Sequence, residues 1–136
     1  MKVTVKNISL TFSAGCVGGL MNMLAVWLSG LAGLTQALGV KIAPQLTAPW
    51  LYNRLTWGGL WGLMFLWSMR RLSYPVRGLL YCLAPSLVQL FVVFPFQAHK
   101  GVLGLQLGYL TPVVVLIFNA VWGLAAGAWL QLTMAE

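Results

Sequence analysis

The sequence predicts an all-α integral membrane protein with four transmembrane helices, arranged as two tandem pseudo-symmetric helical hairpins. Three observations support this prediction. The 136-residue chain is 60% hydrophobic and only 7% charged, whereas soluble domains contain about 25% charged residues. Four apolar stretches are about as long as the roughly 17 to 25 residues that a helix needs to cross the hydrocarbon. Finally, a set of residues in the first half recurs in the second half at a nearly constant separation.

The four expected spans run from Ile8 to Leu31, from Leu51 to Met69, from Val76 to Phe94 and from Leu110 to Leu132. Lys2 and Lys6 ahead of the first span also suit a signal peptide, but this stretch exceeds the roughly 7 to 15 apolar residues of a signal sequence. We therefore expect a retained first helix. Short connectors join the spans, so residues 1–136 are expected to form a single four-helix transmembrane domain.

The internal repeat is expected to relate residues 8–69 to residues 76–132. The residues that match are Leu46-Thr47 with Leu110-Thr111, Asn53 with Asn119, Gly58 with Gly123, Gly62 with Gly127, and Cys16 with Cys82. The asparagines lie 66 positions apart and the glycines 65, and chance matches between apolar segments would not keep one register. Two spans per copy predict a parallel repeat about an axis along the membrane normal.

Lysine and arginine positions predict the orientation, because short cytoplasmic segments are enriched in these residues. With both termini inside, the cytoplasmic side holds Lys2, Lys6, Arg70, Arg71 and Arg77, against Lys41, Arg54 and Lys100 outside. We therefore expect an N-in and C-in protein, with both termini in the cytoplasm. Pairing of boundary cations with lipid headgroups explains the net charge of +7, so membrane lipids are expected partners and nucleic acid is not.

Small residues at four-residue spacing predict close approach of helix backbones. The expected packing positions are Gly15, Gly19, Gly58, Gly62, Gly123 and Gly127. They predict a tight bundle in which the first, second and fourth spans meet. Pro85 lies inside the third span and predicts a kink or a free carbonyl at Tyr81. The connector from Thr35 to Trp50 has apolar and polar residues at a spacing that predicts a short interfacial helix.

Groups that could carry catalysis are scarce. Glu136 is the only acidic residue, so the membrane segments hold no carboxylate to act as a general base or carry protons. This absence argues against the small multidrug exporters, which depend on an intramembrane glutamate. One histidine and two cysteines cannot close a four-ligand metal site within one chain. We expect His99 to be an interfacial side chain, with haem or metal ligation in a larger complex as the alternative, and neither a cofactor nor enzymatic activity.

Polar side chains at membrane depth are more informative, and they are Asn22, Asn53, Ser86, Gln89 and Asn119. Each costs free energy when it faces lipid, so we expect them to point into the bundle. Interhelical hydrogen bonds, worth roughly 0.6 to 2 kcal/mol each, are the simpler interpretation, and the lining of a solute path is the alternative. Arg54 is expected to snorkel to the outer headgroups. Trp57 and Trp122 are expected to be packed aromatics or, alternatively, the walls of a groove for a lipid tail, quinone or pigment.

One family resemblance rests on a run of residues in the second half of the chain. These residues are Arg77-Gly78-Leu79-Leu80, Gln89-Leu90-Phe91-Val92, Phe94-Pro95 and, downstream, Leu110-Thr111-Pro112. The run resembles the second half of the YagU-type bacterial inner-membrane proteins, which implies an inner-membrane location.

Two functions are consistent with these features. The sequence favours a non-enzymatic structural or accessory membrane protein that packs in a homo-oligomer or a larger membrane complex. The alternative is a passive channel or facilitator for a small solute or lipid-like molecule, lined by Asn22, Asn53, Gln89 and Asn119. The two differ in whether these polar residues converge on a hydrated cavity or are each capped by a neighbouring helix.

Overall fold

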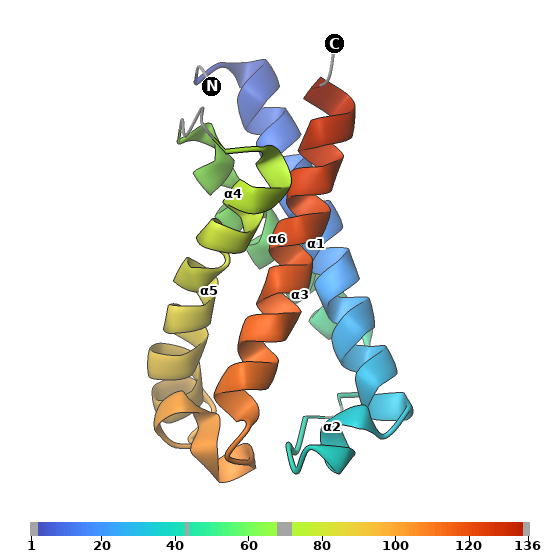
Figure 1. Ribbon diagram of the computed structural model, residues 1–136, viewed down its shortest axis with the longest axis vertical. Coiled ribbons are helices and arrows are strands. Elements are labelled where there is room, and N and C mark those ends of the chain that lie inside the picture. Colours follow the sequence, from blue (N-terminus) through green and yellow to red (C-terminus); the bar gives the residue numbers. More distant parts are fainter. Residues whose placement is uncertain (1–2, 43, 68–71, 135–136) are drawn as a thin grey trace.

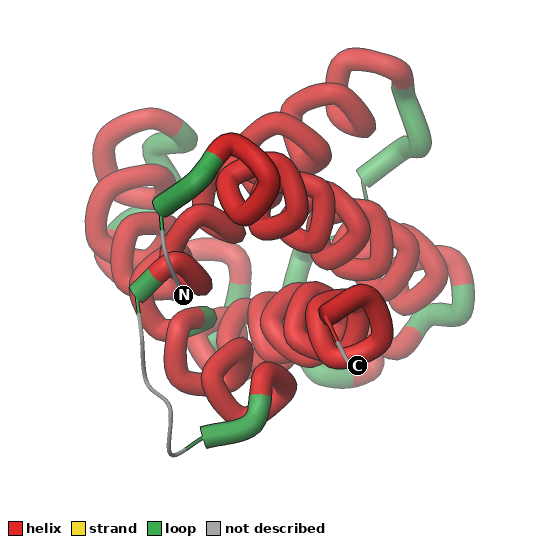
Figure 2. Tube along the Cα trace, turned by 90° about the horizontal axis from the view of Figure 1, so that it is seen from above, coloured by secondary structure: helices red, strands yellow, loops and turns green. Residues whose placement is uncertain are grey.

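The computed structural model describes residues 3–42, 44–67 and 72–134, and every regular element in them is a helix (Figure 1). The elements are α1 (Val5–Leu31), α2 (Leu34–Ala37), α3 (Ala48–Gly62), η1 (Leu63–Leu66), α4 (Tyr74–Tyr81), α5 (Leu83–Val88), η2 (Gln89–Gln97), η3 (Val102–Leu107) and α6 (Thr111–Met134). The view from above shows only helices and connecting loops (Figure 2). The predicted all-α class is confirmed for the described residues.

Three helical segments are long and apolar enough to cross a membrane, namely Val5–Leu31, Tyr74–Gln97 and Thr111–Thr133. They are consistent with the expected membrane protein. The expected second span, Leu51 to Met69, is not among the segments found in the described residues. There α3 ends at Gly62, η1 continues to Leu66, and Met69 lies outside the described residues. Several glycines near the end of α3 weaken the α-helix, and the chain tightens into a 3₁₀ turn.

The two long connectors meet at one end of the bundle. In Figure 1, α2 and η3 lie at this end, whereas the first turn of α1 and the last turn of α6 lie at the other. The backbone N–H of Lys41 donates to the carbonyl of Leu107 at 2.8 Å, which joins the connectors directly. The expected interfacial helix is shorter than predicted, because α2 ends at Ala37 and Gly39 takes a φ of 72°, which a right-handed helix cannot continue.

Backbone contact between α1 and α3 runs through glycines. Gly15 and Gly58 face each other, and a Cβ atom on Gly58 would lie 2.9 Å from the Cα of Gly19. One turn further along, Gly62 packs against the backbone of Thr11. Because any side chain would fill this space, the glycines allow the close approach that their spacing predicts.

A second helix pair, α4 with α6, makes the same kind of contact. Gly123 faces Gly78, and a Cβ atom on Gly127 would lie 2.7 Å from the Cα of Pro75. Gly127 also contacts the carbonyl of Tyr74. All six glycines expected to pack therefore lie at close helix contacts, and Gly78 joins them.

The glycine contacts of the two helix pairs correspond to each other, with Gly15 against Gly58 in the first pair and Gly78 against Gly123 in the second. Gly15 and Gly78, which lie on the first helix of each pair, are 63 positions apart, whereas Gly58 and Gly123 on the second helices are 65 apart. The sequence match of Cys16 with Cys82, at 66 positions, is therefore not the register of these contacts.

α6 also packs against α1 and carries an aromatic cluster. Gly18 lies against the backbone and indole of Trp122. The rings of Phe65 and Tyr81 meet edge to face with their centroids 5.2 Å apart, and Trp122 packs on Phe65 at 6.4 Å. These buried rings join η1, α4 and α6, so the two helix pairs form one core.

The third expected span changes its helical geometry along its length. The α-helix is interrupted at Cys82, three residues before Pro85, which agrees with the expected kink. From Gln89 to Gln97 the chain forms a wider π-helix that contains Pro95. Such segments are rare and frequently lie at functional sites.

Candidate functional site

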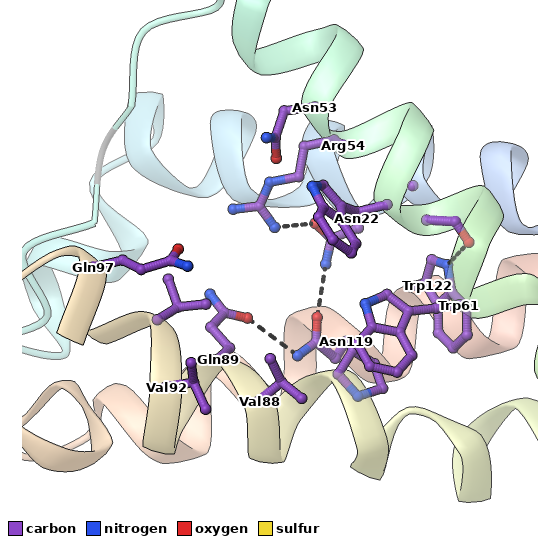
Figure 3. A pocket seen from close by; sticks show the side chains of 15 residues that line it. Asn22, Asn53, Arg54, Trp61, Val88, Gln89, Val92, Gln97, Asn119 and Trp122 are labelled. Carbon is purple, nitrogen blue, oxygen red and sulfur yellow. Dashed lines mark hydrogen bonds between the residues drawn. The ribbon is translucent and has the colours of Figure 1, made fainter. Parts of the chain in front are cut away.

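A cavity of about 290 Å³ lies between α1 and α3 on one side and α5, η2 and α6 on the other (Figure 3). We call it the polar cavity. Its polar lining consists of Asn22, Asn53, Arg54, Gln89, Gln97 and Asn119. Its apolar lining includes Trp57, Val88 and Val92, which are 54%, 38% and 44% exposed. Because these exposed side chains come from facing elements, the cavity opens on the side of the bundle.

Two residues of the polar lining, Asn22 and Arg54, lie deep in the expected membrane region. Asn22 is four residues beyond the middle of α1, which places it about 6 Å from that middle along the helix axis. The carbonyl of Arg54 packs on Gly19, only one residue beyond the middle of α1. A cation at the centre of a spanning helix costs about 2.5 to 3.5 kcal/mol on insertion scales. A compensating environment is therefore needed around Arg54.

One hydrogen-bonded chain begins at Arg54 and crosses from α3 to α1 and α6. The Nη1 of Arg54 donates to Oδ1 of Asn22 at 3.0 Å. The Nδ2 of Asn22 donates to the carbonyl of Phe118 at 2.7 Å and to Oδ1 of Asn119 at 3.4 Å. Asn22 is 4% exposed and Asn119 is 7% exposed, so the hydrogen-bonded chain runs through two buried amide side chains.

From Asn119 the chain continues to the third expected span. The Nδ2 of Asn119 donates to Oγ of Ser86 at 2.9 Å and to Oε1 of Gln89 at 3.3 Å. Ser86 in turn donates to the carbonyl of Cys82 at 2.7 Å. The hydrogen-bonded chain therefore connects five helical elements, α3, α1, α6, α5 and η2, and it ends at Gln89 on the far wall of the polar cavity (Figure 3).

The structure brings together three of the four polar residues expected to line a path. Asn22, Gln89 and Asn119 share the hydrogen-bonded chain, whereas the side chain of Asn53 is exposed and lines the polar cavity outside that chain. Arg54 differs from its expected position at the outer headgroups, because it turns inward to Asn22. Arg54 lies four residues before the packing residue Gly58, just as Asn119 lies four residues before Gly123. Counted from these glycines, Arg54 rather than Asn53 corresponds to Asn119.

Sequence reasoning missed the inward direction of Arg54, although a signal was present. Arg54, Gly58 and Gly62 are spaced four residues apart, so they share one helix face. The glycines on that face were expected to pack against another helix, so the side chain of Arg54 on the same face must also point toward that helix. The same spacing holds for Asn119, Gly123 and Gly127.

The two matched tryptophans have different environments. Trp122 is 4% exposed, and its Nε1 donates to the carbonyl of Gly58 at 3.3 Å. Trp57 is half-exposed at the opening of the polar cavity. Trp122 is therefore a packed aromatic, whereas Trp57 forms part of the cavity wall.

The polar cavity offers hydrogen bonding and positive charge. Within the described ranges, no group of three or more histidine, cysteine or acidic side chains gathers to hold a metal ion. Cys16 and Cys82 are both free thiols, and His99 is exposed in a connector. The sole acidic residue, Glu136, lies outside the described part of the chain. The lining therefore suits binding of a polar group.

Comparisons with protein-family models, with curated protein sequences and with solved structures found no match for this chain. The geometry of the polar cavity therefore carries the functional inference.

Proposed function

We propose that this protein is a non-enzymatic integral membrane protein that acts as a passive facilitator, admitting a small solute or the polar part of a lipid-like molecule into the polar cavity. The observation that carries this proposal is the convergence of Asn22, Gln89 and Asn119 on an open cavity of about 290 Å³ at membrane depth. Polar groups that only cap one another between packed helices need no such space.

The proposed architecture has four membrane crossings in two tandem hairpins, with both termini in the cytoplasm of a bacterial cell. The equivalent contacts of Gly15 with Gly58 and of Gly78 with Gly123 support the two hairpins. The position of both connectors at one end of the bundle supports an even number of crossings (Figure 1). In this arrangement α3 and η1 lie in the second crossing. The bias of lysine and arginine residues supports the orientation.

Flux measurements test the facilitator directly. The purified protein is placed in liposomes, and the movement of glycerol, urea and a fluorescent short-chain lipid is compared with that in empty liposomes. We expect saturable movement of at least one probe, reduced in Asn119→Leu and Gln89→Leu variants that keep their fold. No movement above empty liposomes for any probe would reject the proposal.

A second candidate function is that of a structural or accessory subunit. It is favoured by the internal hydrogen bonds of Asn22 and Asn119, which satisfy both buried amides without a ligand. An accessory subunit would show no flux and would co-purify with a homo-oligomer or with another membrane protein at fixed stoichiometry. The same liposome and purification experiments therefore separate the two functions.

A further inference from the structure

We propose that the polar cavity binds an oxyanion, in particular the phosphate of an anionic membrane amphiphile, and that Arg54 is its anchor. This inference rests on the proposed function, because it names the chemistry of the ligand that the polar cavity admits. Three features carry it, namely the direction of the hydrogen bonds, the unbalanced charge of Arg54 and the mixed polar and apolar opening.

The direction of the hydrogen-bonded chain is fixed by Arg54. A guanidinium can only donate, so the oxygen of Asn22 must face it and the amide nitrogen of Asn22 must point toward α6. Ser86 donates to a carbonyl, so its oxygen is left to accept from the nitrogen of Asn119. Gln89 therefore presents its oxygen to Asn119 and keeps its NH₂ group free to donate.

The two ends of the chain consequently offer donors to the same space. Figure 3 shows the guanidinium of Arg54 and the amide of Gln89 on opposite walls of the polar cavity. Among the described residues, Arg54 makes one side-chain hydrogen bond, to Asn22, and its charge also lies 5.7 Å from the ring centre of Trp50. A guanidinium has five N–H donors, so most of its capacity remains for a ligand.

The charge of Arg54 has no acidic partner within the part of the chain that the structure describes, since the single acidic residue of the sequence is Glu136. Both interactions that Arg54 makes are with neutral groups. An oxyanion would balance this charge at membrane depth and would accept from Arg54 and Gln89 together. Guanidinium groups bind phosphate and carboxylate in a bidentate manner, which adds both strength and geometry.

The opening of the polar cavity favours an amphiphile over a free ion. Trp57, Val88 and Val92 line it and are partly exposed at the side of the bundle, where an acyl chain would meet apolar surface. The volume of about 290 Å³ exceeds that of a single small ion and approaches the roughly 300 Å³ of small ligand pockets. A lipid phosphate and free inorganic phosphate share the chemistry that Arg54 recognises, so the experiment separates them.

The test measures ligand-induced stabilisation of the purified protein in a neutral detergent. Dioctanoyl phosphatidate is compared with dioctanoylglycerol, which differs by the phosphate alone, and with inorganic phosphate. We expect saturable stabilisation by phosphatidate and none by the diacylglycerol. Stabilisation by inorganic phosphate at similar concentration would assign the site to free oxyanions, which also supports the role of Arg54.

Two variants and one control make the test specific. Arg54→Gln keeps a donor for Asn22 and loses the charge, and Gln89→Glu keeps the acceptor for Asn119 and loses the free NH₂ group. We expect each to weaken phosphatidate binding about tenfold or more, because charge-assisted hydrogen bonds are lost or opposed. Lys41→Gln removes an exposed connector charge and should bind like the wild type.

Equal phosphatidate binding by the wild type and both variants would overturn the inference, and so would equal stabilisation by the diacylglycerol. Flux of neutral solutes without phosphate binding would also overturn it while leaving the proposed facilitator in place. Phosphate binding that depends on Arg54, in a protein without flux, would support the inference and reject passive passage.

Discussion

Replacement of Asn119 by leucine tests how much the buried hydrogen-bonded chain contributes to stability, compared with the exposed part of the cavity wall. Asn119 makes three side-chain hydrogen bonds, at 2.9, 3.3 and 3.4 Å, to Ser86, Gln89 and Asn22. Interhelical hydrogen bonds in membranes are worth about 0.6 kcal/mol each on average, so their loss removes about 2 kcal/mol. Leucine has a similar size and adds apolar surface, which offsets part of this loss.

The partners of Asn119 limit the damage further. Asn22 keeps the carbonyl of Phe118, and Gln89 is half-buried and faces the polar cavity, where water replaces the lost donor. We therefore expect Asn119→Leu to lower the free energy of unfolding by about 1 to 2 kcal/mol. Asn53→Leu is the matched control, because Asn53 is exposed and should change stability by less than about 0.5 kcal/mol. Reversible unfolding in mixed micelles measures both, and equal losses would refute the assignment of Asn119 to a buried chain.

Three further predictions concern packing and topology. Gly123→Leu should cost about 1 to 3 kcal/mol of stability, since any side chain there meets the backbone of Gly78. The control Ala128→Leu, on an exposed face of the same helix, should cost little. Similar melting temperatures for the two variants would contradict the contact. Trp122→Phe should cost about 1 kcal/mol by removing the bond to Gly58, seen as a lower unfolding midpoint, and an unchanged midpoint would argue against this bond. Reporters placed near Ser73 and after Glu136 should both read cytoplasmic, and either one outside would reject the proposed orientation.

Much of the architecture was readable from the sequence because it depends on composition and spacing. The apolar stretches predicted four spans, and three of them are found as helices long enough to cross a membrane. The small residues at four-residue spacing predicted that Gly58 and Gly123 lie at close helix contacts, although the partner of Gly123 is Gly78 in the third expected span rather than a residue of the first or second. Gly78 was missed, although Gly78, Cys82 and Ser86 form the same kind of small-residue row on one helix face. A cysteine and a serine at this spacing indicate close helix packing less strongly than a second glycine does.

The register within the proposed repeat was harder to predict. Identity matches gave Asn53 with Asn119, whereas the helix contacts relate Arg54 to Asn119. A difference of one residue turns a side chain by about 100° around a helix, so Asn53 lies exposed and Arg54 points inward. The packing glycines define the buried face more reliably than the matched polar residues, because backbone contact tolerates no rotation.

The polar cavity itself was not predictable from residue types. Its walls come from α1 and α3 on one side and from α5, η2 and α6 on the other, and one of these walls is interrupted at Cys82 and becomes a π-helix from Gln89. Pro85 indicated a change of direction, but its extent is set by tertiary packing. The polar residues could be identified from the sequence, whereas the space between them could not.

Water access to the polar cavity is the most direct test of the proposed function. Val92→Cys and Ile117→Cys are made in a Cys16→Ala, Cys82→Ala background and treated in liposomes with a water-soluble thiol reagent. Both positions lie in segments long and apolar enough to cross a membrane and are 44% and 55% exposed, but of the two only Val92 lines the polar cavity. Thiols react as thiolates, which lipid disfavours and water supports. We expect Val92→Cys to react and Ile117→Cys to remain unmodified, whereas equal protection of both would show that the polar cavity is closed to water and would contradict the proposed function.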